Sequence, residues 1–407
     1  MVNYMQLPSG WKPADVIEQP YLTMRHGAWQ PAQEHMPSAA PALGTNIRFS
    51  VLTWNLDARR PELDARIDSI LLQLRIMVEN CPVLILPVIM LSEVTPPCLE
   101  RLRQTLWVKM HFNISDTAAS PPASGTLMLI PRLFPIKTVY RVPCGVTKGG
   151  TPRDLLFVDV ALTNRNSSAA AEAGERVFRL CTAHLAGLFP RQRAKVLAKA
   201  AAHLRLAHLG VLGGDLHAVT AWDAAAAAEN RLRDAFLEQG GVERDKEAAT
   251  FGPTADLRDV RAIGPHRTDK ILFCGHATVL CYDTFGKKAV VSDPWAQREL
   301  LEHGRLARPW ASDHLGVEAV FAVKQDEGEE GEWIVDDDDD DDDDDEDEDG
   351  GEQGNEGQPG WIGDEEEEHE EDEDEDEDGE EMGEWIVDDE VDGNELYYPM
   401  LSEEGWM

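Results

Sequence analysis

Short apolar runs separated by polar turns make up most of the chain between residues 47 and 323. The first run, residues 47–56 (IRFSVLTWNL), predicts a buried strand. Apolar residues then recur three or four positions apart from Leu63 to Leu74, which predicts a helix that Pro61 opens. Further runs predict strands at residues 83–91, 125–131, 134–142, 153–162, 176–185, 209–216, 270–275, 277–283 and 316–323.

Few helical patterns accompany these strands. Residues 191–207 (RQRAKVLAKAAAHLRLA) predict one helix, and we interpret the alanine-rich residues 217–236 as another helix outside the sheets. About ten strands with so few helices do not fit a simple alternation of strand and helix. We therefore expect an α/β (α+β) fold, a four-layer sandwich of two packed mixed β-sheets flanked by helices.

Composition divides the chain into three parts. Residues 1–44 are rich in Pro, Ala and Gln and predict a loosely ordered leader, and residues 45–325 hold the folded domain. Residues 326–407 contain 45 of the 77 acidic residues and no Lys or Arg, so the net charge of −40 combines a body near +5 with a tail of −45. Such a segment has too little apolar surface to offset its ordering entropy, and we expect a disordered acidic tail.

The tail repeats the motif GEWIVDD at residues 331–337 and 383–389. Apolar islands in an acidic chain are typical of short binding motifs, although slippage in a repetitive coding sequence explains them equally well. Three interpretations of the tail stay open: it competes with DNA for a basic groove, it binds a basic protein partner such as a histone, or it only keeps the protein hydrated.

Six scattered cysteines without CxxC pairs favour reduced thiols in an intracellular compartment. The longest apolar run, Val83 to Leu91, is far shorter than the ~20 residues that span a bilayer, and the first residues do not have the pattern of a signal peptide. We expect no membrane association, and a monomer.

Polar residues able to hold a metal and a phosphate follow the ends of the apolar runs. In chain order they are Asn55, Asp57, Glu93, His184, Asp215, His217, Asp269, Asp313 and His314. Each alone is more often a turn or capping residue, or a structural histidine. The ordered set, with each member at the same kind of structural edge, favours a catalytic site.

Phosphodiester cleavage explains these residue types. Mg²⁺ prefers a few carboxylate oxygens with water completing its shell, which suits Glu93 and Asp57, and Mn²⁺ could replace it. Asp215 is the best candidate to orient or deprotonate the attacking water, and Asn55, His184 and His314 can donate to the phosphate. Asp313 should point away from His314 in an extended segment, so a distant carboxylate such as Asp269 is expected to hold the imidazole.

The blocks TWNLD, LSEV, TAHL, GGDLH, RTDKILF and SDHLG resemble the endonuclease/exonuclease/phosphatase superfamily. Through TWNLD, EVTPPCLERL, RDLLFVDVAL and the RQRAKVL helix the closer resemblance is to its 5′-tyrosyl-DNA phosphodiesterase branch. It covers residues 47–323 and implies a two-sheet sandwich. It also implies magnesium at Asp57 and Glu93, general acid/base action by Asp215, transition-state stabilisation by His314, and supporting roles for Asn55, His184 and Asp269.

The implied activity is hydrolysis of the bond between a tyrosine and the 5′-phosphate of DNA, which repairs topoisomerase 2 lesions. That substrate implies that the binding partners are DNA 5′ ends that carry a protein or tyrosine adduct. It also implies a nuclear location, and a cytoplasmic location stays open as well. A basic groove for phosphates could include Arg153, Arg191, Arg193, Lys195 and Arg267.

Three departures from the branch bear on substrate choice. His217 stands where the family has an asparagine, and imidazole cannot reproduce an amide that donates and accepts through adjacent atoms. Thr268 replaces an aromatic, and Phe251 is the nearest counterpart of a base-stacking tryptophan. Two alternatives therefore stay open: another nuclease or phosphatase of the superfamily, and a catalytically degenerate, histone-binding acidic scaffold.

Overall fold

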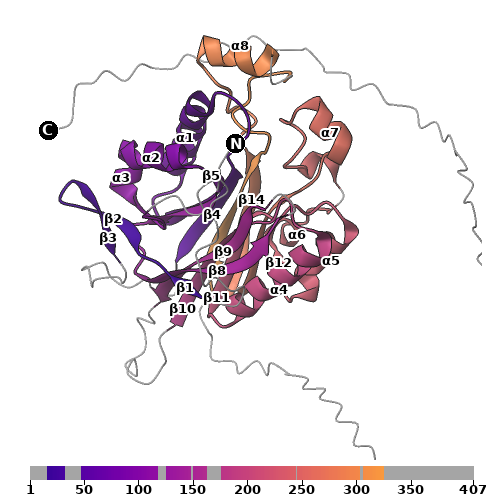
Figure 1. Ribbon diagram of the computed structural model, residues 1–407. Coiled ribbons are helices and arrows are strands. Elements are labelled where there is room, and N and C mark those ends of the chain that lie inside the picture. Colours follow the sequence, from indigo (N-terminus) through magenta and orange to yellow (C-terminus); the bar gives the residue numbers. More distant parts are fainter. Residues whose placement is uncertain are drawn as a thin grey trace, which may run out of the picture. The chain divides into compact units, whose positions relative to one another are not determined.

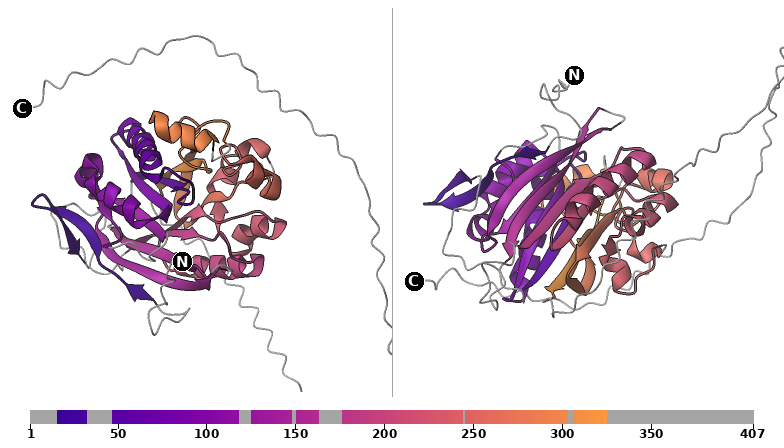
Figure 2. Two further views of the ribbon diagram at one scale, coloured as in Figure 1. Left: turned by 45° about the horizontal axis from the view of Figure 1, so that its top comes forward. Right: turned by 90° about the horizontal axis from the view of Figure 1, so that it is seen from below.

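The computed structural model describes residues 16–32, 47–117, 125–147, 150–162, 176–243, 245–302 and 306–324. They form two mixed β-sheets packed face to face with helices outside, so the predicted fold class is confirmed for this part of the chain (Figures 1 and 2). The acidic tail, its repeats and most of the leader lie outside the described residues. Within the described ranges, no helix has the length and apolar character needed to cross a bilayer.

One sheet has seven strands in the order β1-β8-β9-β10-β11-β13-β12. Their bounds are Ile17–Glu18 (β1), Ile136–Val146 (β8), Pro152–Leu162 (β9), Arg176–His184 (β10), Leu209–Asp215 (β11), Arg233–Asp234 (β12) and Asp269–Gly275 (β13). β10 and β11 run parallel, and the other neighbours run antiparallel.

The second sheet has eight strands in the order β14-β15-β4-β5-β7-β6-β2-β3. Their bounds are Tyr21–Arg25 (β2), Ala28–Ala32 (β3), Arg48–Asn55 (β4), Ile85–Val94 (β5), Phe112–Ile114 (β6), Gly125–Pro131 (β7), Ala277–Phe285 (β14) and Gly316–Val323 (β15). Here β4 and β5 form the parallel pair. Each sheet thus contains one parallel pair whose carboxyl ends lie side by side.

Helices cover the outer faces of both sheets (Figure 1). Those described are Leu63–Asn80 (α1), Pro96–Gln104 (α2), Leu106–His111 (α3), Pro190–Arg205 (α4), Ala221–Glu229 (α5), Ala235–Glu238 (α6), Leu257–Ile263 (α7) and Pro294–Glu302 (α8). Apolar residues of α1 to α3 pack on the eight-stranded sheet, and those of α4 and α5 pack on the seven-stranded sheet. Between the sheets Phe49 lies 4.6 Å from Phe178 and 5.1 Å from Phe321, ring centre to ring centre.

Residues 16–32 correct the prediction of a loosely ordered leader. They form β1 at the edge of one sheet and the β2–β3 hairpin at the edge of the other. Tyr21 and Leu22 are buried in two different apolar clusters, and the hairpin turns at His26 and Gly27 with φ of 49° and 78°. This Xaa-Gly turn fits the twist of a two-residue hairpin. The dipeptide His26-Gly27 was therefore the feature of the sequence that could have predicted the hairpin.

The helix predicted over residues 217–236 is also interrupted. α5 ends at Glu229, Arg231 has a left-handed backbone with φ of 55°, and Arg233 and Asp234 pair with β13 as the short strand β12. The side chain of Asp234 then accepts a hydrogen bond from the backbone of Phe236 and caps α6. Alanine content predicted the helix correctly, but the polar break after Glu229 ends it.

Candidate active site

The polar candidates converge because parallel strands end at one edge of each sheet. In the eight-stranded sheet Asn55 ends β4 beside β5, and in the seven-stranded sheet His184 and Asp215 are register partners at the ends of β10 and β11. Asp269 pairs with Asp215 at the start of β13. The Nδ2 atom of Asn55 donates a 3.0 Å hydrogen bond to Oδ2 of Asp215, so the site joins the two sheets.

The glycine before Asp215 explains part of the GGD sequence. Gly214 has φ of 152°, and a Cβ atom there would lie 2.0 Å from the backbone oxygen of Ala183. Only glycine permits this approach of β10 and β11, because any other side chain would force the strands apart. The residue directly before Asp215 therefore has to be glycine.

Asp215 is surrounded by donors. Besides Asn55, it accepts a 2.9 Å hydrogen bond from the backbone of His217, and its Oδ2 lies 3.4 Å from Nε2 of His184 and 3.9 Å from Nε2 of His314. Burial alone would raise the pKa of Asp215, but His314 and His184 outweigh burial and hold that pKa below its usual range. The carboxylate is therefore held ionised.

His314 is held by Asp269, as the sequence predicted. Its Nδ1 lies 2.7 Å from Oδ2 of Asp269, which also accepts hydrogen bonds from Thr250 (2.8 Å) and Thr268 (3.0 Å). Burial would lower the pKa of His314, but Asp269, Asp313 and Asp215 raise it well above the ordinary value. The raised pKa favours the imidazolium form, and the Nε2 side of the ring faces the site.

Asp313 corrects one detail of the sequence analysis. We expected it to point away from His314, but its Oδ1 lies 3.8 Å from Nε2 of that ring. The segment bends because Ser312 donates to the backbone oxygen of Asn55 (2.6 Å) and accepts from the backbone of His314 (3.1 Å). An extended segment would separate the two side chains, and this turn brings both to the site.

The expected metal ligands have the environment of a cation site. Oδ2 of Asp57, one of the two expected ligands, has no hydrogen-bond partner among the described residues and only an ionic contact, 2.8 Å from Nε of Arg60. Oδ1 of Asp313, which we expected to be catalytic and not a metal ligand, is also buried without a hydrogen-bond partner there. Burial, and then the charge of Asp313, raises the pKa of Asp57 to about 6. Glu93 is nearby, because it accepts a 2.8 Å hydrogen bond from the backbone of Ala58. Buried, crowded carboxylate oxygens of this kind fit a Mg²⁺ ion.

The backbone supports this interpretation. Among the described residues six non-glycine residues have positive φ, and three of them are site candidates: Asp57 (50°), Glu93 (59°) and His217 (49°). Such conformations cost free energy and are found where the surrounding structure fixes a functional geometry. The loops after β4 and β11 share this feature with the irregular end of β5, where the pairing register shifts between Leu91 and Val94.

A second cluster of possible ligand atoms lies beside the first. Single atoms of Asp215, Asp269 and His314 lie within 4.8 Å of one another. We do not assign the metal to this cluster, because Nδ1 of His314 is already paired with Asp269, whose Oδ2 also accepts from Thr250 and Thr268. The cluster is better suited to contact negative oxygens of a phosphate.

Three of the proposed substrate contacts are corrected. Arg193 is buried and pairs with Asp223 (2.6 Å), and Arg267 is buried and pairs with Asp234 (2.7 Å) and Glu243, so neither can line a groove. Phe251 is only 7% exposed, and its ring centre lies 5.2 Å from that of His314, so it supports the imidazole and offers no face to a base. A single sequence position cannot distinguish these buried roles from exposed ones.

Arg153 and Arg191 remain available to substrate. Arg191 is exposed in the first turn of α4. Arg153 donates to the backbone oxygen of Ala186 (3.0 Å), and burial lowers its pKa while Glu93 and Asp215 raise it. The guanidinium of Arg153 is therefore within electrostatic reach of both carboxylates.

Sequence reasoning missed Arg66, which is fully buried on α1. It donates only to backbone oxygens, which belong to Leu56, Asp57, Arg60, Pro61 and Ala311 at 2.6 to 3.0 Å. One guanidinium thus braces both the loop of Asp57 and the segment before Asp313. The position of Arg66 on the apolar face of the predicted helix was the feature of the sequence that indicated a buried role.

Neither a family model nor a curated protein sequence matches the chain. Its structure is similar to a humanized TDP2 from D. rerio (16% identity, 67% of this chain and 98% of that one, TM-score 0.48). It is also similar to TDP2 from C. elegans (16%, 68% and 75%, 0.48). An endonuclease/exonuclease/phosphatase family protein from Bacteroides thetaiotaomicron is a further match (13%, 69% and 99%, 0.46). These values are too low to transfer a function, so the residues of the site must carry it.

Proposed function

We propose that this chain is a metal-dependent phosphodiesterase of the endonuclease/exonuclease/phosphatase type that hydrolyses 5′-phosphotyrosyl DNA ends. The observation that carries the proposal is the junction of the two sheets, where Asn55 bonds Asp215 and an imidazolium, His314, faces the same carboxylate. Hydrolysis of a phosphodiester needs an ionised carboxylate that positions the attacking water. It also needs positive charge near the phosphoryl oxygens, where negative charge develops. The ordered sequence blocks independently resemble that superfamily.

The metal would be held by Glu93 and Asp57 and would supply charge neutralisation at the phosphoryl oxygens. The other roles belong to side chains of the chain itself. Asp215 orients the attacking water, and Asn55 and His184 hold that carboxylate in place. His314 donates from Nε2 to a phosphoryl oxygen as negative charge develops, while Asp269 keeps the ring charged.

The tyrosyl-DNA substrate is the finer part of the proposal. It is supported by the resemblance of TWNLD, RDLLFVDVAL and the α4 sequence to the 5′-tyrosyl-DNA phosphodiesterase branch. A TDP2 structure from D. rerio, similar to this chain at 17% identity and a TM-score of 0.47, is described as complexed with a single-strand DNA product. With such a substrate the protein would work in DNA repair in the nucleus.

Release of tyrosine from a short 5′-phosphotyrosyl oligonucleotide, with and without Mg²⁺, tests the proposal on the full chain. We expect Mg²⁺-dependent release that Asp215→Asn reduces by at least about a thousandfold, because that change removes the charge that orients water. Asp68→Asn is the control, because Asp68 is an exposed carboxylate paired with Arg101 on α2. Equal activity of Asp215→Asn and the parent chain would overturn the assignment of the site.

Substrate class is tested separately. The same assay is run with DNA carrying an abasic site, with an RNA end and with a phosphorylated small molecule. Cleavage of one of these by the parent chain, without release of tyrosine, would keep the metal-dependent chemistry and replace the substrate. No cleavage of any of them would reject the enzyme assignment.

A further inference from the structure

Two large aromatic side chains are exposed next to the site. Phe189 is 57% exposed at the N-cap of α4, five residues after His184. Trp222 is 81% exposed in the first turn of α5, seven residues after Asp215. Each ring therefore stands at the far end of a loop that begins at a candidate catalytic residue. Buried aromatics stabilise a core, but rings this exposed do not.

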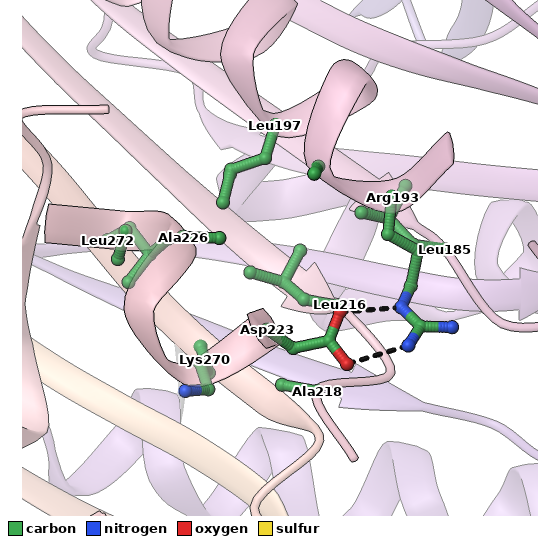
Figure 3. Close-up of a pocket in the computed structure, with 11 residues that line it drawn as sticks. Leu185, Arg193, Leu197, Leu216, Ala218, Asp223, Ala226, Lys270 and Leu272 are labelled. Atoms are coloured by element: carbon green, nitrogen blue, oxygen red, sulfur yellow. Dashed lines mark hydrogen bonds and ion pairs between the residues drawn. The ribbon is translucent and has the colours of Figure 1, made fainter. Parts of the chain in front are cut away.

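One buried guanidinium ties the two helix starts together. Arg193 on α4 donates from Nη1 to the backbone oxygen of Leu188 (2.7 Å) and from Nε and Nη2 to Asp223 (2.8 and 2.6 Å). Figure 3 shows Arg193 and Asp223 paired among the side chains that line a mostly apolar hollow. Because Leu188 precedes Phe189 and Asp223 follows Trp222, the backbones that carry the two rings are fixed to the same group.

This surface is continuous with the site. Leu185 and Leu216, which directly follow His184 and Asp215, line the same hollow as the Arg193–Asp223 pair. Arg153 holds the loop between His184 and Phe189 through the backbone oxygen of Ala186. The starts of α4 and α5 are therefore linked to the strand ends that carry His184 and Asp215, on the side where a polymer would leave the site.

The charge of α4 favours a polyanion. The helix contains no Asp or Glu, and its exposed Arg191 and Lys195 are four residues apart, hence on one face. Arg193, which lies between them in the sequence, is paired with Asp223 and is not available to a ligand. An aromatic ring beside exposed cations is the combination that binds single-stranded nucleic acid, with bases on the rings and phosphates near the cations.

We propose that Phe189 and Trp222 form a stacking platform for unpaired bases next to the cleaved phosphodiester, with Arg191 and Lys195 contacting the adjoining phosphates. The proposal rests on the function proposed above and adds the residues of this chain that would hold a single-stranded end. Bases in a duplex have both faces covered by neighbours, so a stacking platform selects unpaired ones. Phe189 and Trp222 would then stack on bases, which is the role that we first expected of Phe251.

Equilibrium binding of a fluorescent 5′-phosphorylated single-stranded oligonucleotide to the full chain, in EDTA, tests the platform without catalysis. We expect Phe189→Ala and Trp222→Ala each to weaken binding about fivefold or more, which is the lower end of measured base–aromatic stacking. Trp222→Phe should recover most of the affinity, and Trp222→Leu should not. Blunt duplex of the same length should bind more weakly than the single strand, with little change on Trp222→Ala.

Trp295→Ala is the matched control, because Trp295 is 63% exposed on α8, outside this surface. Binding that all three alanine variants leave unchanged would overturn the platform while leaving the proposed chemistry intact. An equal loss for Trp295→Ala would also overturn it. If the unaltered chain binds no oligonucleotide, single-stranded or duplex, a nucleic-acid substrate fails and the platform fails with it. Thermal melting of each variant checks that its fold is retained.

Discussion

Nδ1 of His314 lies 2.7 Å from Oδ2 of Asp269, and the opposite nitrogen of the same ring lies 3.9 Å from Oδ2 of Asp215. Asp269 fixes the orientation of the ring, and Asp215 faces its other nitrogen. Because Thr250 and Thr268 also donate to Asp269, the orientation of the ring is set by side chains that do not touch substrate.

Asp269→Asn should reduce turnover about a hundredfold or more, because His314 loses the charge that keeps its pKa raised. A raised pKa means that the proton is retained as pH increases, so the parent chain should show no loss of activity near pH 6.5 from this group. The variant should lose activity above about pH 6.5, the ordinary histidine pKa. Initial rates from pH 5 to 9 measure both effects.

Asp159→Asn is the control for that variant, since Asp159 is a largely buried carboxylate paired with Arg179 at 2.7 Å outside the site. It should keep the pH profile of the parent chain. An Asp269→Asn profile identical to that of the parent would show that Asp269 does not set the charge of His314.

Glu93→Gln should weaken metal binding at least about tenfold and lower activity further, because the amide keeps the size of the side chain but loses its charge. Its oxygen can still accept from the backbone of Ala58, so the fold should be preserved. Isothermal titration with Mn²⁺ measures the affinity. Glu100→Gln, an exposed change on α2, should have no effect, and unchanged Mn²⁺ affinity in Glu93→Gln would place the metal elsewhere.

The sequence was sufficient to predict most strands and the convergence of the site. Apolar runs ending in Asn55, His184 and Asp215 mark buried strand ends, and sheet geometry then brings those ends together. The sequence could not predict which arginine is buried. Arg267 is buried and paired with Asp234, while Arg191 is exposed, and only the tertiary packing of their elements separates the two. Likewise, the bend at Ser312 depends on a hydrogen bond to a residue 257 positions away.

His217→Asn should stabilise the fold by about 0.5 to 1 kcal/mol, because asparagine tolerates the left-handed backbone, φ of 49°, better than histidine. It should also raise kcat/KM on tyrosyl-DNA severalfold if the amide improves phosphate positioning. Urea denaturation and steady-state kinetics measure the two effects.

His26→Asn separates them, because His26 has the same φ of 49° in the β2–β3 turn, far from the site in sequence and outside the candidate residues. It should show the gain in stability without the gain in activity. A parallel rise in activity in both variants would assign the effect to stability alone.

Arg66→Met should lower the free energy of unfolding by about 3 to 5 kcal/mol, because it removes a fully buried guanidinium and leaves five backbone oxygens without their donor. Activity should fall as well, because two of those oxygens lie in segments of the site. One belongs to Asp57, an expected metal ligand, and the other to Ala311, two residues before Asp313. Arg75→Met, on the exposed face of the same helix, should change stability by less than about 0.5 kcal/mol. Urea denaturation compares the pair, and equal midpoints would show that Arg66 braces neither loop.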